Sequence, residues 1–202
     1  SFLNLEELPK NFCTLNHLRK LNFSHNLLTS KLDGLEQLTE LHELNLSFNE
    51  IVECNLEKLI QLQELDLSRN QLKTITGLDK LSQLQKLNIS RNRNLILDNT
   101  LDNNINLEKL SISTIKKVPS LACLTNLKEL DLSANTLTNV PQEIHKLILL
   151  KVLNLSNNAL ADISPICNLT NLKELDICEN KLTNVSQEIC KLVLLKVLNL
   201  SD

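Results

Sequence analysis

The residue types best suited to binding another protein recur along the chain at intervals of 21 or 22 residues: Phe48, Arg69, Arg91 with Arg93, and the carboxylate pair Glu43 and Glu64. Aromatic rings and guanidinium groups are the side chains that most often anchor protein interfaces. A fixed interval also means that one structural element, repeated, must present them. We therefore predict that these six side chains bind a partner.

Side chains that could perform catalysis form no recognisable set. The four histidines fall at unrelated places relative to this interval: His17, His25, His42 and His145. No nucleophile elbow, phosphate-binding loop or zinc-peptidase motif occurs. Carboxylates such as Glu64 and Asp66 alternate with leucines, which is typical of the solvated face of a strand. We predict that the chain is not an enzyme and that it has no metal site and no cofactor.

Composition limits the kind of partner. The chain has 202 residues and a formal net charge of −3, so it lacks the overall basic field that attracts nucleic acid. No run of about 18 apolar residues, the length needed to cross a bilayer, is present. The predicted partner is therefore another protein, with no nucleic-acid binding and no membrane insertion.

One pattern fills the chain and must position these residues. It reads Leu-x-x-Leu-x-Leu-Ser-x-Asn-x-Leu, and its nine copies begin at Leu18, Leu41, Leu62, Leu84, Leu107, Leu127, Leu150, Leu172 and Leu195. A partial copy precedes the first. Within each copy, leucines alternate with polar residues, as in a half-buried strand. Leucines then recur every third residue, as at Leu78, Leu81 and Leu84, which predicts a helical or 3₁₀ return.

An asparagine follows seven of the nine predicted strands where the backbone must turn: Asn26, Asn49, Asn70, Asn92, Asn135, Asn158 and Asn180. A buried turn leaves backbone donors and acceptors that need partners, and a side-chain amide supplies both kinds of group. We predict that these residues form a structural ladder from one copy to the next. The fifth copy has no such asparagine, and Asn94 stands where a leucine is expected. A local irregularity is predicted between residues 91 and 118, through a tolerated deletion rather than a functional kink.

The pattern resembles the leucine-rich repeat family over essentially the whole chain. The segment from Leu137 through Val140-Pro141 to Leu147 resembles the 23-residue intracellular class. The segment from Leu72 through Gly77 to Leu81 resembles the 22-residue class of phosphatase-regulatory proteins. The resemblance implies an α/β fold, namely a right-handed curved solenoid. A parallel sheet would line its concave side, with short helices or 3₁₀ turns on the convex side.

The resemblance also implies a single domain over 1–202, of about nine repeats plus a partial N-terminal unit. Neither end has a polar capping unit, so the chain is predicted to be a fragment of a longer protein. The implied function is a scaffold or regulatory module that holds a partner on the concave face. Small GTPases and phosphatases are the partners that the resemblance makes plausible.

Six cysteines bear on where the protein works: Cys13, Cys54, Cys123, Cys167, Cys178 and Cys190. They form no Cys-x-x-Cys pair, and the cysteine-rich caps of extracellular members of the family are absent. Free thiols and a cytoplasmic location are therefore predicted. Two alternatives stay open: the ligand-binding segment of a secreted or cell-surface receptor or adhesin, and the targeting domain of a larger signalling enzyme.

Overall fold

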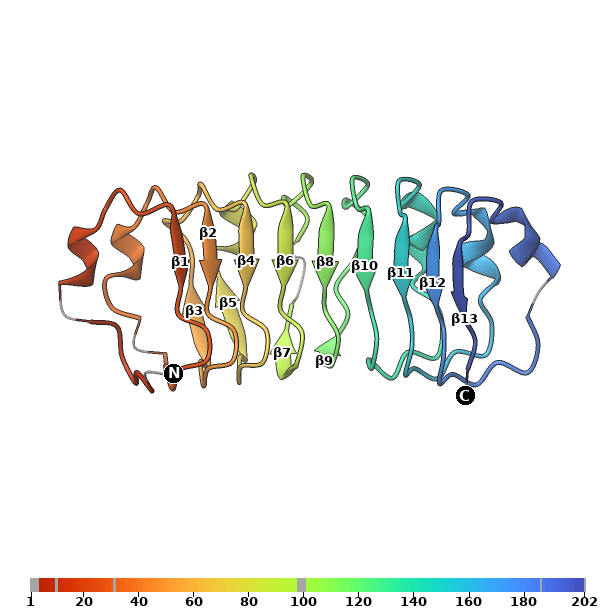
Figure 1. The fold of residues 1–202 in the computed structure, drawn as a ribbon, viewed down its shortest axis with the longest axis horizontal. Coiled ribbons are helices and arrows are strands. Elements are labelled where there is room, and N and C mark those ends of the chain that lie inside the picture. The colour runs from red at the N-terminus through yellow and green to blue at the C-terminus, as the bar shows by residue number, and fades with distance from the viewer. Residues whose placement is uncertain (1–3, 10, 31, 98–100, 186, 202) are drawn as a thin grey trace.

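A computed structural model describes residues 4–9, 11–30, 32–97, 101–185 and 187–201, apart from the side chain of Cys13. Within them the chain coils repeatedly, and each coil contributes one strand to a nine-stranded parallel sheet. In sheet order the strands are β1 (Lys20–Asn22), β2 (Glu43–Asn45), β4 (Glu64–Asp66), β6 (Lys86–Asn88), β8 (Lys109–Ser111), β10 (Glu129–Asp131), β11 (Val152–Asn154), β12 (Glu174–Asp176) and β13 (Val197–Asn199). Figure 1 shows them side by side along the length of the molecule.

The return segments are short and contain no α-helix among the described residues. Their 3₁₀ helices are η1 (Phe12–Thr14), η2 (Leu35–Gln37), η3 (Leu78–Lys80), η4 (Gln142–Lys146), η5 (Ser164–Asn168) and η6 (Gln187–Lys191). Four further strands pair as two small parallel sheets: β3 (Glu53–Asn55) with β5 (Thr74–Thr76), and β7 (Asn92–Ile96) with β9 (Ile115–Lys117). The predicted 3₁₀ returns are confirmed, whereas these extra strands are a finding of the structure.

The core is a stack of leucines. The middle residue of each inner strand of the main sheet points inward, and Leu44, Leu65, Leu87 and Leu110 are each at most 2% exposed. They lie in register, because Leu44 is the Cα partner of Leu65, and Leu65 of Leu87. At the C-terminal end of the sheet, Leu198 of β13 is 41% exposed, because β13 pairs with β12 alone among the described strands. Burial thus depends on having a coil on both sides.

The predicted irregularity lies in β7, and it changes which side chain faces the core. β7 is five residues long, and its pairing with β9 shifts register between Asn92 and Ile96. As a result Leu95 is buried and Asn94 is exposed. The place where the pattern expects a leucine, held by Asn94 in the sequence, is thus taken in the core by Leu95, one residue later. Opposite Asn92, the ladder position of the fifth coil is held by Ile115, and the β7–β9 pairing links the two coils there.

A left-handed backbone residue ends the turn after each of the first eight strands of the main sheet. These residues precede the ladder position in their coils and have φ between 49° and 59°: His25, Phe48, Arg69, Arg91, Thr114, Ala134, Asn157 and Glu179. None is a glycine, although the left-handed region is costly for most other residues. The repeated turn therefore imposes a conformation that the local sequence does not favour.

Thr114→Gly should raise the free energy of unfolding by about 0.5–1 kcal/mol, because a β-branched residue at φ 53° is strained and glycine is not. Thermal and denaturant melts measure the change. Thr76→Gly is the matched control: Thr76 lies exposed in β5, where glycine weakens a strand, so that variant should lose stability. If both variants are destabilised alike, the left-handed residue carries no strain.

Candidate functional site

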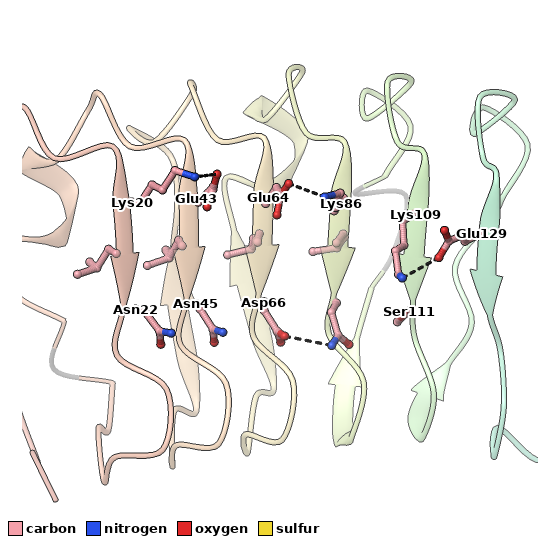
Figure 2. Close-up of a pocket in the computed structure, with 15 residues that line it drawn as sticks. Lys20, Asn22, Glu43, Asn45, Glu64, Asp66, Lys86, Lys109, Ser111 and Glu129 are labelled. Carbon is pink, nitrogen blue, oxygen red and sulfur yellow. Dashed lines mark hydrogen bonds and ion pairs between the residues drawn. The ribbon is translucent and has the colours of Figure 1, made fainter. Parts of the chain in front are cut away.

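The outward side chains of the main sheet form two rows that line an open hollow of about 720 Å³. The first row comes from the first residue of each strand, and the second row comes from the third. Figure 2 shows both rows over β1 to β8, with Glu129 of β10 completing the first row. The strand alternation predicted from the sequence thus directs two side chains per coil, most of them polar, away from the core and one leucine toward it.

Ion pairs between neighbouring coils occupy the first row. The ammonium groups of Lys20, Lys86 and Lys109 lie 2.6 Å from the carboxylates of Glu43, Glu64 and Glu129, respectively. The hydrogen bond to Glu43, and then the charge of Glu43, raise the pKa of Lys20. The pKa of Lys86 is raised in the same way by Glu64. All six side chains are exposed to solvent, which screens the charges, so each pair contributes little to stability.

The second row shapes the turn that follows each strand. The side-chain oxygens of Asn22, Asn45 and Asp66 each accept a hydrogen bond from the backbone N–H two residues later, at 2.8–2.9 Å. The amide of Asn88 donates to the other carboxylate oxygen of Asp66 at 3.2 Å. These side-chain oxygens satisfy backbone donors where the strand ends and are therefore engaged within the protein.

The ladder asparagines bond to backbone in two coils at once. The side-chain oxygen of Asn70 accepts from the backbone N–H of Ile51 at 3.0 Å, and its amide donates to the carbonyls of Leu46, Leu67 and Ser68 at 2.9, 3.0 and 3.3 Å. The other six repeat this arrangement with small variations: Asn26, Asn49, Asn92, Asn135, Asn158 and Asn180. Their amides hold the coils together and leave nothing for a ligand.

Aromatic and cationic side chains stack on one rim of the sheet, in the turns after β1, β2 and β4. The rings of His25 and Phe48 are 4.0 Å apart between centroids with an angle of 18° between their planes. On the other side of Phe48, the guanidinium carbon of Arg69 lies 4.6 Å from the ring centroid, a cation–π contact. Phe48 remains 39% exposed. Three successive coils therefore present one ordered stack to solvent.

The six partner-binding residues predicted from the sequence fall into two places. Glu43 and Glu64 start β2 and β4 and face the hollow, where each is paired with a lysine. Phe48 and the arginines belong to the rim, with Arg91 in the next turn and Arg93 just inside β7. His25 is not among the six predicted residues, although its position one repeat before Phe48 signals that the two rings are neighbours. We call His25, Phe48, Arg69, Arg91 and Arg93 the rim cluster.

The described cysteines are unpaired and differ in their exposure to solvent. Five cysteines in the described part of the chain are free thiols: Cys54, Cys123, Cys167, Cys178 and Cys190. Burial raises the pKa of the Cys54 thiol to about 12, so it behaves as a core side chain. Cys167 is fully buried whereas Cys190, at the equivalent repeat position, is exposed; the expectation for the side chain of Cys13 lies outside the described residues. No described group of three His, Cys, Asp or Glu residues could hold a metal ion.

Three family profiles match segments of the chain. They are described as leucine-rich repeats (2 copies) over residues 148–189, leucine-rich repeat over 125–168, and leucine-rich repeat over 61–81. These segments contain strands and ladder asparagines of the geometry described above. The chain is a leucine-rich repeat protein. Its parallel sheet and short 3₁₀ returns are those of a leucine-rich repeat solenoid.

Solved structures of other leucine-rich repeat proteins superpose closely on this solenoid. A protein from Leptospira interrogans matches with a TM-score of 0.87 and 28% identity over 96% of this chain and 53% of its own. The functional domain of InlJ from Listeria monocytogenes, which includes a cysteine ladder, matches with a TM-score of 0.82 and 25% identity over 96% of this chain and 43% of its own. The structure of TLR13 with ssRNA13 matches with a TM-score of 0.79 and 27% identity over 97% of this chain and 31% of its own.

This leucine-rich repeat protein thus spans about half the length of the first two of these structures. A search of curated proteins found no match. No helix in the described residues is long and apolar enough to cross a membrane.

Proposed function

We propose that this leucine-rich repeat protein is a non-catalytic scaffold or regulatory module that binds another protein through the rim cluster and the adjoining sheet face. The fold is one that commonly serves protein–protein interaction. The observation that carries the proposal is the exposed stack of His25, Phe48 and Arg69. A ring held between two planar groups is already ordered, so a partner that packs on it loses little side-chain entropy.

The rest of the sheet face offers a weaker anchor. Towards the C-terminus the rim carries Ala134, Asn157 and Glu179, and β12 presents Glu174 and Asp176. These small or acidic side chains bury little apolar area, and acidic residues are depleted at the centres of interfaces. The proposal therefore places the partner over the N-terminal half. Small GTPases and phosphatase catalytic subunits are candidate partners by family resemblance alone, and the fold does not choose between them.

A second candidate is the ligand-binding segment of a secreted or cell-surface receptor or adhesin. The observation in its favour is the likeness to InlJ and TLR13, together with an internalin C2 that matches with a TM-score of 0.83 and 26% identity over 93% of this chain. The targeting domain of a larger enzyme is the third reading. In each case the same rim cluster would contact the bound protein, so one experiment tests the site for all three.

Phe48→Ala and Arg69→Ala should each weaken partner binding at least about fivefold, while the melting temperature stays nearly unchanged, because both side chains are exposed and lie outside the core. The partner is first captured with the wild-type protein from its native source and identified, and dissociation constants are then measured by calorimetry.

Glu174→Lys is the control, because it changes an exposed charge on β12 without touching the rim cluster. Its affinity should stay within about twofold of wild type, in line with the small effects of most interface and surface positions. Loss of binding in this variant, with normal binding by the Phe48 and Arg69 variants, would place the site in the C-terminal half and refute the proposal.

For the cellular location we propose the cytoplasm, and the support is chemical. The five described thiols are unpaired, and disulfides are rare in reducing compartments. Counting reactive thiols in denatured, non-reduced protein from the native source should account for all six cysteines of the sequence. An intramolecular disulfide would contradict the cytoplasmic proposal and favour the secreted alternative.

A further inference from the structure

Positive charges on the strands of the main sheet are neutralised within the protein. Lys20, Lys86 and Lys109 each meet a glutamate of the adjacent strand at 2.6 Å. A partner that approached these lysines would have to displace a carboxylate that is already hydrogen-bonded. The strand lysines therefore add little attraction for an anionic group.

Positive charges on the rim form no ion pair with any carboxylate among the described residues. Among the described residues, no carboxylate oxygen lies within 4.0 Å of the guanidinium nitrogens of Arg69, Arg91 or Arg93, since every ion pair there involves a lysine or a histidine. Asp66, three residues before Arg69, accepts hydrogen bonds from the backbone of Ser68 at 2.8 Å and from the amide of Asn88 at 3.2 Å. The structure thus places three uncompensated cations on two neighbouring coils.

The repeat holds these cations close together. Arg69 and Arg91 occupy the same left-handed turn position in adjacent coils, with φ of 55° and 59°, and Arg93 follows two residues later at the start of β7. Adjacent parallel strands lie about 4.8 Å apart, so the turns that leave them are also close. Like charges at this spacing repel one another in the free protein, and an anionic ligand would relieve that repulsion.

We propose that the rim cluster recognises an acidic segment of its partner protein, in which aspartate or glutamate side chains pair with Arg69, Arg91 and Arg93; this rests on the proposed function. The guanidinium carbon of Arg69 lies 4.6 Å from the centroid of the Phe48 ring, so this fork of N–H donors is held over the ring. A planar carboxylate matches that fork with two parallel hydrogen bonds. The exposed part of Phe48 then packs against the aliphatic portion of the same segment.

The test uses the side-chain signals of the arginines as reporters. The chain has four arginines, so nitrogen-15 labelling gives one Nε–Hε resonance for each, and Arg19 is the internal control. Arg19 is an exposed arginine that immediately precedes β1, at the end of the strands opposite the rim. The probe is a short synthetic peptide in which glutamates alternate with serines, compared with the same peptide carrying glutamines and with one carrying phosphoserines at matched charge.

The expected result is that the glutamate peptide shifts the resonances of Arg69, Arg91 and Arg93 but not that of Arg19, and that the glutamine peptide shifts none. Arg69→Gln should weaken binding of the glutamate peptide about tenfold, which is the effect expected from the loss of one charge-assisted hydrogen-bonded pair. Equal shifts at all four arginines would mean general Coulomb attraction and would overturn the proposal, as would no shift at all. Saturation by the phosphoserine peptide at about tenfold lower concentration would show a phosphate site instead.

The same variants separate this inference from the proposed function. One outcome is that Phe48→Ala no longer binds the native partner, whereas Arg69→Gln, Arg91→Gln and Arg93→Gln bind it normally. The rim cluster is then the docking site, and the partner segment is not acidic. If Phe48→Ala also binds normally, the proposed site itself is wrong.

Discussion

Leu65→Ala should lower the free energy of unfolding by about 2–5 kcal/mol, through lost burial and the cavity left behind. Leu65 is the middle residue of β4, is 2% exposed, and lies in register between Leu44 and Leu87. Coils on both sides are fixed by strand pairing, so the structure has little freedom to collapse into the space. Urea titration followed by circular dichroism measures the loss.

Leu198→Ala provides the matched control. Leu198 is the middle residue of β13, the same strand position, but it is 41% exposed because β13 has one neighbouring strand. The same truncation at Leu198 should lower the free energy of unfolding by less than about 1 kcal/mol, because the Leu198 side chain has less buried apolar area to lose. Equal losses at Leu65 and Leu198 would show that stacking between two coils is not what stabilises the leucine core.

Asn70→Ala should cost about 2–3 kcal/mol, because it removes four side-chain hydrogen bonds from a residue that is 8% exposed. The carbonyls of Leu46 and Leu67 keep bonds from Asn49 and Asn92, respectively. The backbone N–H of Ile51 loses its bond to Asn70, and an unpaired buried donor carries most of the penalty.

Asn16→Ala is the control for Asn70→Ala. Asn16 is exposed, and substitutions at such surface positions change stability by less than about 0.5 kcal/mol. Asn157 is a poor comparison despite its exposed rim position, because its φ of 55° is one that asparagine tolerates better than alanine. A loss at Asn70 no larger than at Asn16 would mean that the ladder does not stabilise the stack.

The solenoid was predictable because its signals repeat. Leucine alternation gave the strands, and the three-residue leucine spacing gave the 3₁₀ returns. The asparagines mark turns whose backbone groups need an amide. A repeat also tells which residues become neighbours, so Phe48 and Arg69 were predicted to lie on successive coils. Nine copies of one pattern make each of these inferences much stronger than any single copy would.

Features that depend on one coil were harder to predict. The left-handed turn position holds residues as different as His25, Thr114 and Glu179, none with a glycine's preference for positive φ, so local propensity gives no signal there. The bulge in β7 moves Leu95 into the core, which pattern matching in a fixed register misses. The stacking of His25 on Phe48 requires side-chain rotamers and turn geometry that spacing alone does not determine.

The central claim, that a partner protein lies over the rim cluster, is tested most directly by site-specific photo-crosslinking. Benzoylphenylalanine replaces Phe48 in one variant, Val152 of β11 in a second, and the exposed Leu149, three residues before Val152, in a third. Each protein is irradiated with its native partner, and crosslinked peptides are identified by mass spectrometry. We expect the partner to be captured at position 48, with an acidic segment at the crosslink, and not at 149 or 152. Capture at 149 or 152 without capture at 48 would contradict the account.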